Sequence, residues 1–318
     1  MNEYGQTDNL PEFTDVKAAA GRISAHIHLT PVLHSDSFDT RTGARVMFKC
    51  ESFQRTGSFK VRGALNSVLA RGPISPQSGV ATHSSGNHGQ ALAWAGRFAG
   101  LPVHVVVPEH SNPMKVSAMR GYGANIYTCE EGARGREEGL RGVLAQTGAT
   151  QIHPSNDFYV IAGQGTSALE LFAHTPDLDL LFVPLGGGGL LSGSLLAMSG
   201  AAPRCRVIGV EPALADDGVR SLREGRILPS DYPPTIADGL KTALGSRTFP
   251  LIRRHVHELV TVTEAEIFQA LVYTMERLKA VIEPSSAVAV AALLSGKVPV
   301  AGKKVGVIIS GGNLDFNS

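Results

Sequence analysis

The chain has 318 residues, of which 43% are hydrophobic, and its formal net charge is +1 at pH 7. A near-neutral charge excludes the strongly basic surface that proteins use to bind nucleic acid or an anionic membrane. The longest apolar runs have the length of a strand, far below a membrane span. We therefore expect a globular protein of one or two domains that binds neither nucleic acid nor a membrane.

The N-terminal residues and the cysteines both bear on the compartment. Residues 1–13 mix acids, amides and a proline, without the basic start and apolar stretch of a secretory signal. Cys50, Cys129 and Cys205 are far apart and lie outside any CxxC pattern. Scattered cysteines in odd number fit reduced buried thiols better than disulfides or a zinc site. We expect a cytoplasmic protein.

Short apolar runs alternate with helical patterns along the chain. In the first half the pattern predicts, in chain order, a strand at 79–82, a helix at 89–100, a strand at 103–107, a helix at 113–120 and a strand at 125–128. In the second half it predicts strands at 178–184, 206–210 and 304–310, with helical stretches between them. This alternation predicts an α/β fold of two open, mostly parallel sheets with helices on both faces, facing a cleft.

Four consecutive glycines, Gly186, Gly187, Gly188 and Gly189, connect a predicted strand directly to a helical run. Without Cβ atoms, successive backbone N–H groups can turn inward around an anion, and a helix N-terminus adds a favourable dipole. A merely flexible turn would be an entropically costly use of four glycines. We interpret the segment as a phosphate-binding loop, although it matches neither the P-loop nor the dinucleotide-binding fingerprint.

Three further segments place polar groups next to predicted strands or helices. Lys60 follows an aromatic residue and begins an apolar helical pattern. Desolvation there would lower the pKa of its amine and suit Schiff-base chemistry, although most single lysines are only solvated surface charges. The segment 84–89 lies between a strand and a helix, where it could hold a carboxylate or simply cap the helix. Ser310 closes the last predicted strand and could present its hydroxyl to the same cleft.

Four motifs, taken together and in this order, resemble the fold-type II pyridoxal-phosphate enzymes and, within them, the serine racemase and serine/threonine dehydratase branch. They are Ser-Phe-Lys at 58–60, Ser-Ser-Gly-Asn-His-Gly at 84–89, the four glycines at 186–189 and Ser-Gly-Gly-Asn at 310–313. The resemblance extends from about residue 13 to the end of the chain. It implies a fold like that of the tryptophan synthase β subunit.

The resemblance also implies how the chain is divided. A large cofactor-binding domain would comprise residues 1–72 and 153–318, and a small domain on the substrate side would comprise residues 73–152. The active site would lie in the cleft between them, and the small domain would close over the substrate. Because relatives are commonly dimers, we expect a homodimer.

Each matched residue acquires an implied role. Lys60 would carry pyridoxal 5'-phosphate as a Schiff base and act as the catalytic base. The other cofactor contacts would come from Phe59 beside the ring, Asn87 at the ring hydroxyl, Ser310 at the pyridine nitrogen, and Gly186, Gly187, Gly188 and Gly189 at the phosphate. The substrate carboxylate would be surrounded by Ser84, Ser85 and His88. A neutral hydroxyl at the ring nitrogen makes the cofactor a weaker electron sink than an aspartate would, which favours loss of a β-substituent over transamination.

These roles predict a dehydratase, or ammonia-lyase, that converts a β-hydroxy amino acid to a 2-oxo acid and ammonia. Serine, threonine, threo-3-hydroxyaspartate and phenylserine are the candidate substrates. A serine racemase is the alternative function, because racemisation needs an acid on the face of the cofactor opposite Lys60, and Ser85 could supply it. The alternative role of Ser85 is contact with the carboxylate only. A β-replacing synthase of the same fold and a non-catalytic cofactor-binding regulator are further alternatives.

The resemblance also implies a metal site. The carboxylates of Glu211 and Asp217 and the carbonyl of Ala215 would form an all-oxygen site for Mg²⁺ or Ca²⁺. Such a site would brace the cofactor domain without entering the chemistry. Acidic residues in a surface loop are otherwise often only solvated, and this stays the alternative.

The substrate side of the predicted site is less clearly defined. Arg136 would reach a second substrate carboxylate, which a guanidinium binds bidentately. A solvated helix face shared with Arg134 and Arg141 is the alternative. Ser155 and Thr242 stand where close racemase relatives tend to carry asparagine and serine, so the β-substituent of the substrate stays open.

Overall fold

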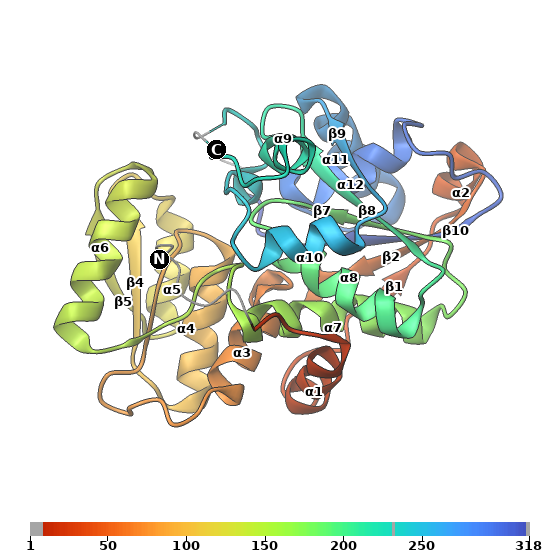
Figure 1. Cartoon of the computed structure of the whole chain (residues 1–318). Helices are drawn as coiled ribbons and strands as arrows, with labels where there is room; N and C mark the ends of the chain where they lie inside the picture. The colour runs from red at the N-terminus through yellow and green to blue at the C-terminus, as the bar shows by residue number, and fades with distance from the viewer. Residues whose placement is uncertain (1–8, 231–232, 316–318) are drawn as a thin grey trace.

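The computed structural model describes residues 9–230 and 233–315. Most of the N-terminal segment that argues against a secretory signal lies outside these residues. The described chain forms two open sheets, and each is covered by helices on both faces, as the sequence predicts. Figure 1 shows the two sheets side by side. None of the helices in the described ranges combines the length and the apolar character needed to cross a membrane.

The larger sheet has six strands in the order β1-β2-β10-β7-β8-β9, and only β1 runs antiparallel to its neighbour. Their bounds are β1 Val32–Leu33, β2 Arg45–Cys50, β7 Leu180–Pro184, β8 Arg206–Pro212, β9 Glu258–Val262 and β10 Lys304–Ile309. Every residue of the central strand β7 is buried. A continuous apolar run is typical of a parallel strand with helices on both faces.

The smaller sheet has four parallel strands in the order β5-β4-β3-β6. Their bounds are β3 Val80–His83, β4 Val103–Pro108, β5 Asn125–Cys129 and β6 Thr150–Gln151. This sheet therefore uses residues 80–151 only, whereas the larger sheet uses segments before and after that range. The ranges are compatible with the domain boundaries expected from the sequence, which remain a prediction.

Helices cover the larger sheet on both faces. One face packs against α2 Asp36–Thr42, α11 Glu264–Leu278 and α12 Pro284–Leu294, and the other packs against α1 Phe13–Ile23, α7 Phe158–His174, α8 Gly189–Ala201 and α10 Thr248–His255. The short helix α9 Asp217–Glu224 follows β8, and three single turns of 3-10 helix lie at η1 Glu51–Phe53, η2 Arg55–Gly57 and η3 Asp238–Leu240.

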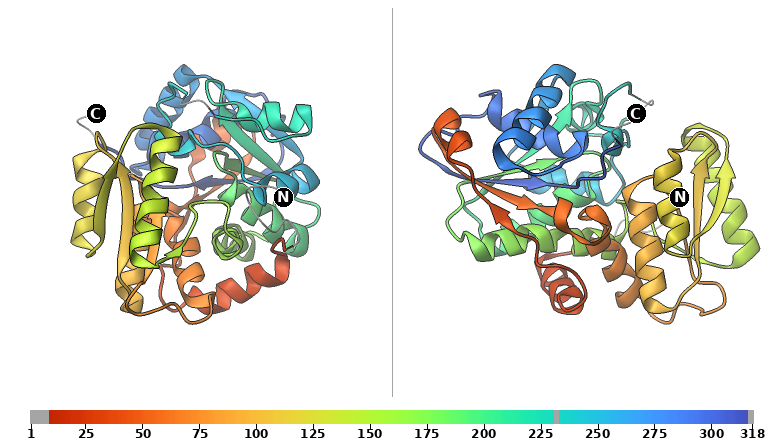
Figure 2. Two further views of the ribbon diagram at one scale, coloured as in Figure 1. Left: turned by 60° about the vertical axis from the view of Figure 1, so that its left-hand side comes forward. Right: turned by 180° about the vertical axis from the view of Figure 1, so that it is seen from behind.

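The smaller sheet packs against α3 Lys60–Ala70, α4 Asn87–Ala99 and α5 Pro113–Gly121 on one face and against α6 Gly132–Thr147 on the other. Helices α3 and α4 lie between the two sheets, whereas α6 lies on the outer side (Figure 1; Figure 2). Helix α3 also packs against α7 of the larger sheet. The segment that begins with Lys60 is thus held between both halves of the molecule.

Three of the predicted motifs follow strands directly. Residues 84–86 separate β3 from α4, Leu185 and the first three glycines separate β7 from α8, and Ser310 follows β10. The predicted strand at 304–310 is one residue too long, and the predicted helix at 89–100 begins two residues too late, because Asn87 already belongs to the first turn of α4. The carboxyl ends of parallel strands are where ligands bind in open α/β sheets.

Candidate active site

Lys60 is the first residue of α3 and is partly buried. Its Nζ donates a hydrogen bond to the Pro154 carbonyl at 3.0 Å and lies 5.1 Å from the centroid of the Phe59 ring. Burial lowers the pKa of Lys60 to about 8, although the Glu283 carboxylate acts in the opposite direction. About a tenth of this amine is therefore unprotonated at pH 7, far more than for an ordinary lysine, and the unprotonated form is the one that a nucleophile or base requires.

The turn before Lys60 is joined to the turn after β10. The Phe59 backbone N–H donates to the Ser310 carbonyl at 2.9 Å, and Ser58 and Gly311 form an isolated antiparallel bridge. The Ser310 side chain is 3% exposed. Two segments about 250 residues apart in the chain are therefore fixed side by side, which brings Lys60 and Ser310 into one site.

The four glycines are packed too closely for side chains. A Cβ on Gly187 would clash with Ser155 Oγ, one on Gly186 would lie 2.9 Å from Leu240 Cα, and one on Gly188 would lie 2.7 Å from Thr248 Cβ. Gly188 also has a φ of +85°, which favours glycine. Because the first N–H groups of α8 lack intrahelical partners, the loop offers bare backbone donors suited to a phosphate.

Ser155 faces this loop. Its side chain is 6% exposed and lies against Gly187 and Gly189. In the sequence it stands out only as a departure on the substrate side. Its contact with the glycine loop is visible only in the folded chain.

Asn87 is held in a hydrogen-bond chain that sequence reasoning missed. Its Nδ2 donates to both carboxylate oxygens of Glu283, at 2.9 and 3.0 Å, and its Oδ1 accepts from Asn313 Nδ2 at 2.8 Å. Asn313 Nδ2 also donates to the Thr56 carbonyl at 2.8 Å, in the segment before Lys60. Burial raises the pKa of Glu283 to about 7. Glu283 and Asn313 both lie in segments that the resemblance covers, but nothing in the sequence pairs them with Asn87.

The turn between β3 and α4 carries the residues expected at the substrate carboxylate. Ser84 and Ser85 are partly exposed, and the Ser84 N–H donates to the Val106 carbonyl at 3.1 Å. His88 is 2% exposed, and its Nε2 lies 3.3 Å from the Ile152 carbonyl. Burial, with the Lys60 charge second, holds the pKa of His88 well below its usual value. His88 therefore contributes a neutral ring, and its contact with a substrate stays a prediction.

Arg136 differs from the arginines near it in sequence. Arg134 and Arg141 are exposed, and Arg134 pairs with Glu138 on the helix surface at 2.8 Å. Arg136 is partly buried, and burial lowers the pKa of its guanidinium. Its charge is close enough to His83, at the end of β3, to add to the effect of burial, which lowers the pKa of His83 to about 4. Arg136 thus directs its charge toward the carboxyl end of the smaller sheet.

Sequence reasoning assigned no role to two histidines, His83 and His153. The rings of His83 and His153 meet edge to face, with centroids 5.9 Å apart. His153 Nδ1 accepts from the backbone N–H groups of Ser155 and Asn156, at 3.2 and 2.9 Å. Burial lowers the pKa of His153 to about 3, so that its ring is neutral and carries its hydrogen on Nε2. His83 follows the strand predicted at 79–82, but no strand was predicted before His153, so no pattern in the sequence indicated that the two rings meet.

Glu211 and Asp217 form a buried acidic pair at the end of β8 and the start of α9. The Glu211 carboxylate accepts from the backbone N–H groups of Gly218 and Val219, at 3.0 and 2.9 Å. Asp217 Oδ2 is buried without a hydrogen-bond partner. Burial, together with the neighbouring Asp217 carboxylate, raises the pKa of Glu211 to about 8, and burial raises that of Asp217 to about 6.

This donor set fits a cation. An unpartnered carboxylate oxygen beside a second buried carboxylate lacks positive charge, and oxygen ligands suit Mg²⁺ or Ca²⁺. Ala215, whose carbonyl is the third predicted ligand, is 3% exposed and lies in the turn between the two acids. Within the described ranges no three His, Cys, Asp or Glu side chains gather as a metal site. The predicted set has only two such side chains and a carbonyl, so this finding leaves it untested.

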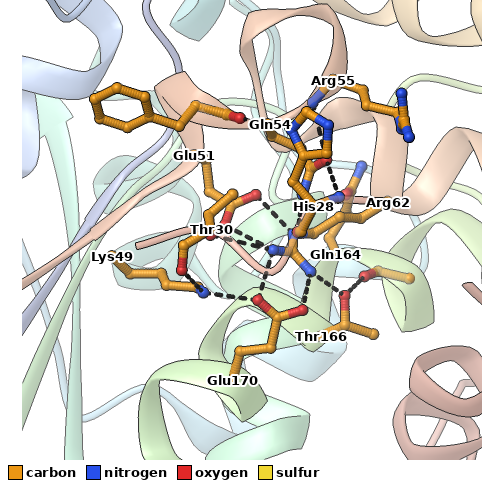
Figure 3. Close-up of polar contacts among 12 residues, drawn as sticks. His28, Thr30, Lys49, Glu51, Gln54, Arg55, Arg62, Gln164, Thr166 and Glu170 are labelled. Carbon is orange, nitrogen blue, oxygen red and sulfur yellow. Dashed lines mark hydrogen bonds and ion pairs between the residues drawn. The ribbon is translucent and has the colours of Figure 1, made fainter. Parts of the chain in front are cut away.

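A second group of buried charges anchors α3 beyond Lys60 (Figure 3). Arg62 is fully buried and pairs with Glu51 and Glu170, at 2.6 Å each. Lys49 of β2 pairs with Glu170 at 2.7 Å. Burial alone would raise the pKa of Glu51, but the Arg62 guanidinium and the Lys49 ammonium lower it below its usual value. These pairs attach the start of α3 to the larger sheet and to α7, which fixes the position from which Lys60 extends.

Comparison with known proteins places this arrangement in a family. Residues 23–311 match the family described as "Pyridoxal-phosphate dependent enzyme". The chain is 45% identical to a β-hydroxyaspartate dehydratase of Paracoccus denitrificans, over 97% of this chain and 98% of the relative. It is 44% identical to the serine racemase of Homo sapiens, over 96% of this chain and 92% of the relative.

A solved structure agrees with these relatives. The crystal structure of the serine racemase from Dictyostelium discoideum superposes with a TM-score of 0.91 at 43% identity, covering 96% of this chain and 99% of the other. The fold-type II resemblance expected from the four motifs is thereby confirmed. The chain belongs to the family of pyridoxal-phosphate dependent enzymes.

Proposed function

We propose that the protein is a pyridoxal-phosphate-dependent ammonia-lyase that removes water and then ammonia from a β-hydroxy amino acid. One observation carries the proposal: the amine of Lys60, with a pKa lowered to about 8, extends from the residue next to Phe59, whose backbone N–H donates to the Ser310 carbonyl. The dehydratase among the relatives, at 45% identity, supports the same reaction.

In this proposal the cofactor, when bound, supplies an electron sink for the charge that develops at the substrate α-carbon. Lys60 would hold the cofactor through its amine and would take the α-proton at its Nζ. The N–H groups of residues 186–189 would bind the phosphate, Phe59 would lie beside the ring, and Asn87 would bind the ring hydroxyl. Glu283 and Asn313 fix the orientation of the Asn87 amide.

The lysine assignment has a direct test. Lys60→Ala should abolish both turnover and the visible absorbance of the covalently held cofactor. Turnover that persists in Lys60→Ala at the wild-type rate would contradict the role of the lysine. Phosphate binding by the glycine loop does not depend on Lys60, so the variant should still retain cofactor by non-covalent contacts.

We further propose a dicarboxylic substrate of the 3-hydroxyaspartate type. Ser84, Ser85 and His88 would hold the α-carboxylate, and Arg136 brings a partly buried guanidinium to the same end of the smaller sheet. A guanidinium binds a carboxylate with two parallel hydrogen bonds. The name of the dehydratase relative supports this choice among the four candidate substrates.

A substrate panel tests this choice. L- and D-serine, L-threonine, threo-3-hydroxyaspartate and phenylserine would be compared by release of 2-oxo acid. Arg136→Met should lower kcat/KM for threo-3-hydroxyaspartate on the order of 100-fold, with less than a tenfold change for serine. Arg134→Met, which removes an exposed arginine of the same helix, is the matched control and should change neither. Equal losses for both substrates in Arg136→Met would contradict the proposed contact.

Racemisation is the second candidate function, and Ser85 favours it. The Ser85 hydroxyl lies in the turn that precedes α4, and the serine racemase relative is 44% identical. If Ser85 supplies the second acid, Ser85→Ala should abolish the loss of substrate chirality. A larger fraction of the 2-oxo acid release should remain. Full racemase activity in Ser85→Ala would dismiss this role. A new amino acid formed on addition of a thiol would instead indicate a β-replacing synthase.

We also propose a divalent cation, Mg²⁺ or Ca²⁺, held by Glu211, Asp217 and the Ala215 carbonyl. The unpartnered oxygen of Asp217 and the raised pKa of both acids support it. The cation would brace the turn between β8 and α9 and take no part in the reaction.

We also propose that the protein is a cytoplasmic homodimer. Analytical ultracentrifugation of the cofactor-loaded enzyme tests the dimer.

A further inference from the structure

A second buried serine stands behind Ser310. Ser286 lies in the first turn of α12 and is fully buried. Its Oγ accepts a hydrogen bond from the Gly311 N–H at 2.7 Å and lies 2.9 Å from Ser310 Oγ. Ser286 Oγ is also within reach to donate a hydrogen bond to the Gly311 carbonyl, at 2.7 Å. We infer that Ser286 is a positioning residue that orients the Ser310 hydroxyl as a hydrogen-bond donor toward the ring nitrogen of the cofactor.

The argument starts from the number of hydrogens available. A serine hydroxyl has one hydrogen and two lone pairs. Ser286 can therefore donate to the Gly311 carbonyl or to Ser310, but not to both. The Gly311 carbonyl has another donor, because the Glu283 N–H lies 3.1 Å from it. Once the cofactor is bound, donation from Ser286 to Ser310 leaves no buried group of this cluster unpaired, because the Glu283 N–H pairs with the Gly311 carbonyl and the ring nitrogen accepts the Ser310 hydrogen.

This order of hydrogens sets what Ser310 can do. When Ser310 accepts from Ser286, its own hydrogen is free to point away from the pair. Donation then runs in one direction, from the Gly311 N–H to Ser286 and on to Ser310, and hydrogen bonds arranged in series strengthen one another. The last donor of the series faces the ring nitrogen if Ser310 has its proposed role. An unprotonated pyridine nitrogen is an acceptor only, so this order favours the neutral ring and the weaker electron sink.

The opposite order has a different consequence. If Ser286 donated to the Gly311 carbonyl, the hydrogen between the two serines would have to come from Ser310. Ser310 would then present only lone pairs and suit a protonated ring nitrogen. Both hydroxyls are neutral and give a protonated ring no counter-charge, which is why we assign the first order.

The inference rests on the proposed function, since it takes Ser310 to face the ring, and its test reads the ring directly. The apoenzyme would be loaded with pyridoxal phosphate labelled with ¹⁵N in the ring, and the ¹⁵N resonance recorded. The wild-type signal should lie in the range of an unprotonated, hydrogen-bonded nitrogen. Ser286→Ala should move it toward that of a pyridine nitrogen without a hydrogen bond, in the direction opposite to protonation.

The neighbouring serine provides a matched control. Ser285 lies in the same turn, is 2% exposed, and accepts the Gly239 N–H at 3.0 Å. Ser285→Ala therefore also leaves a backbone N–H unpaired, but it removes nothing that touches Ser310, and its ¹⁵N signal should match the wild type. Ser286→Thr keeps the hydroxyl and should restore the wild-type signal, while Ser286→Cys, a weak donor of similar size, should shift it in the same direction as Ser286→Ala.

The outcomes separate the inference from the proposed function. A wild-type signal in the range of protonated pyridine would overturn the inference without any variant. Equal shifts in Ser286→Ala and Ser285→Ala would reduce Ser286 to a structural role. If Ser310→Ala moves the signal and Ser286→Ala does not, only the inference fails. If Ser310→Ala leaves the signal unchanged, Ser310 does not face the ring, and the proposed cofactor site fails together with the inference.

Discussion

Two groups of buried charges in this molecule behave in opposite ways. Around Arg62, two cations and two carboxylates are paired at 2.6 to 2.7 Å, and the pKa of Glu51 lies below its usual value. At Glu211 and Asp217, two carboxylates are buried together, and the pKa of each is raised. Glu51, Glu211 and Asp217 are all buried, so burial does not explain the difference. A buried cation pairs with Glu51, whereas the cation next to Asp217, Arg220, is partly exposed and pairs with Asp216.

The comparison separates a structural role from a binding role. A group of charges that balances itself within the chain has no need of a ligand and holds elements together. A buried pair of like charges is costly unless it is protonated or acquires a cation. The first group fixes α3, where Lys60 begins, and the second is the place to expect a metal. Four experiments test this distinction, in decreasing order of expected effect.

Removing a charge from the group around Arg62, in which cations and carboxylates are paired, should have the largest effect on stability. Arg62→Met leaves Glu51 buried without its bidentate partner and should lower the free energy of unfolding by about 3–5 kcal/mol, measured by urea denaturation. The double variant Arg62→Met/Glu51→Leu should recover part of this loss, because it removes the uncompensated charge. Arg134→Met, at an exposed ion pair, should cause no measurable change. Equal losses in the single and double variants would show that lost packing, not charge balance, dominates.

Supplying the missing charge should stabilise the acidic pair. Mg²⁺ at about 100 times its dissociation constant should raise the free energy of unfolding by about 2.7 kcal/mol, and chelation should reverse this. Asp217→Asn should abolish the response. Asp216→Asn, at a partly exposed neighbour that pairs with Arg220, should retain it. An unchanged melting temperature on addition of Mg²⁺ and Ca²⁺ would contradict the metal site.

The pH dependence should distinguish the two groups without any ligand. The folded protein keeps protons on Glu211 up to about pH 8 and on Asp217 up to about pH 6, whereas the ordinary values are 4.5 and 3.8. Their contribution to stability is complete below the ordinary values and is lost as the pH rises through the raised ones. With a chelator present, the free energy of unfolding should therefore fall between pH 5 and pH 8, by about 1.4 kcal/mol for each pH unit over which one acid is protonated only in the folded state.

Controls for this slope come from both groups. Asp217→Asn should make the slope shallower without removing it, because burial still raises the pKa of Glu211. Added Mg²⁺ should also reduce the slope, because the cation binds the ionised acids. Glu51 has a lowered pKa, so its contribution is present above 4.5 and is lost only as the pH falls below that value. A rise in stability from pH 5 to pH 8 in the presence of chelator would contradict the raised values of the acidic pair.

The smallest effect on stability should come from removing one hydrogen bond of the group around Arg62. Thr30 Oγ1 donates to Glu51 Oε1 at 2.7 Å and is buried. Thr30→Val removes this bond while Arg62 still pairs with Glu51, and it should lower the free energy of unfolding by about 1–2 kcal/mol. The Mg²⁺ response should be unchanged. A loss as large as that of Arg62→Met would mean that the hydroxyl, and not the guanidinium, is the main partner of Glu51.

The strands that the sequence predicted are short runs rich in β-branched and other apolar residues. The predicted ranges at 103–107, 125–128 and 206–210 agree with β4, β5 and β8 to within two residues at each end. Strand β2 was not predicted, because Arg45 and Lys49 interrupt its pattern, and the partner that allows Lys49 to be buried is more than a hundred residues away in α7. Strands β1 and β6 have two residues each, too few for a period to be recognised.

The sequence by itself determined the chemical groups of the site and their order, because a lysine before an apolar helix, a run of glycines after a strand and a terminal serine each have a local pattern. Only the tertiary structure decided which of them meet. Asn87 and Glu283 are 196 positions apart, and Ser286 and Ser310 are 24 apart. The pKa values of Lys60, Glu211 and Glu283 were also decided there, because the burial that shifts them exists only after the two sheets and their helices have packed.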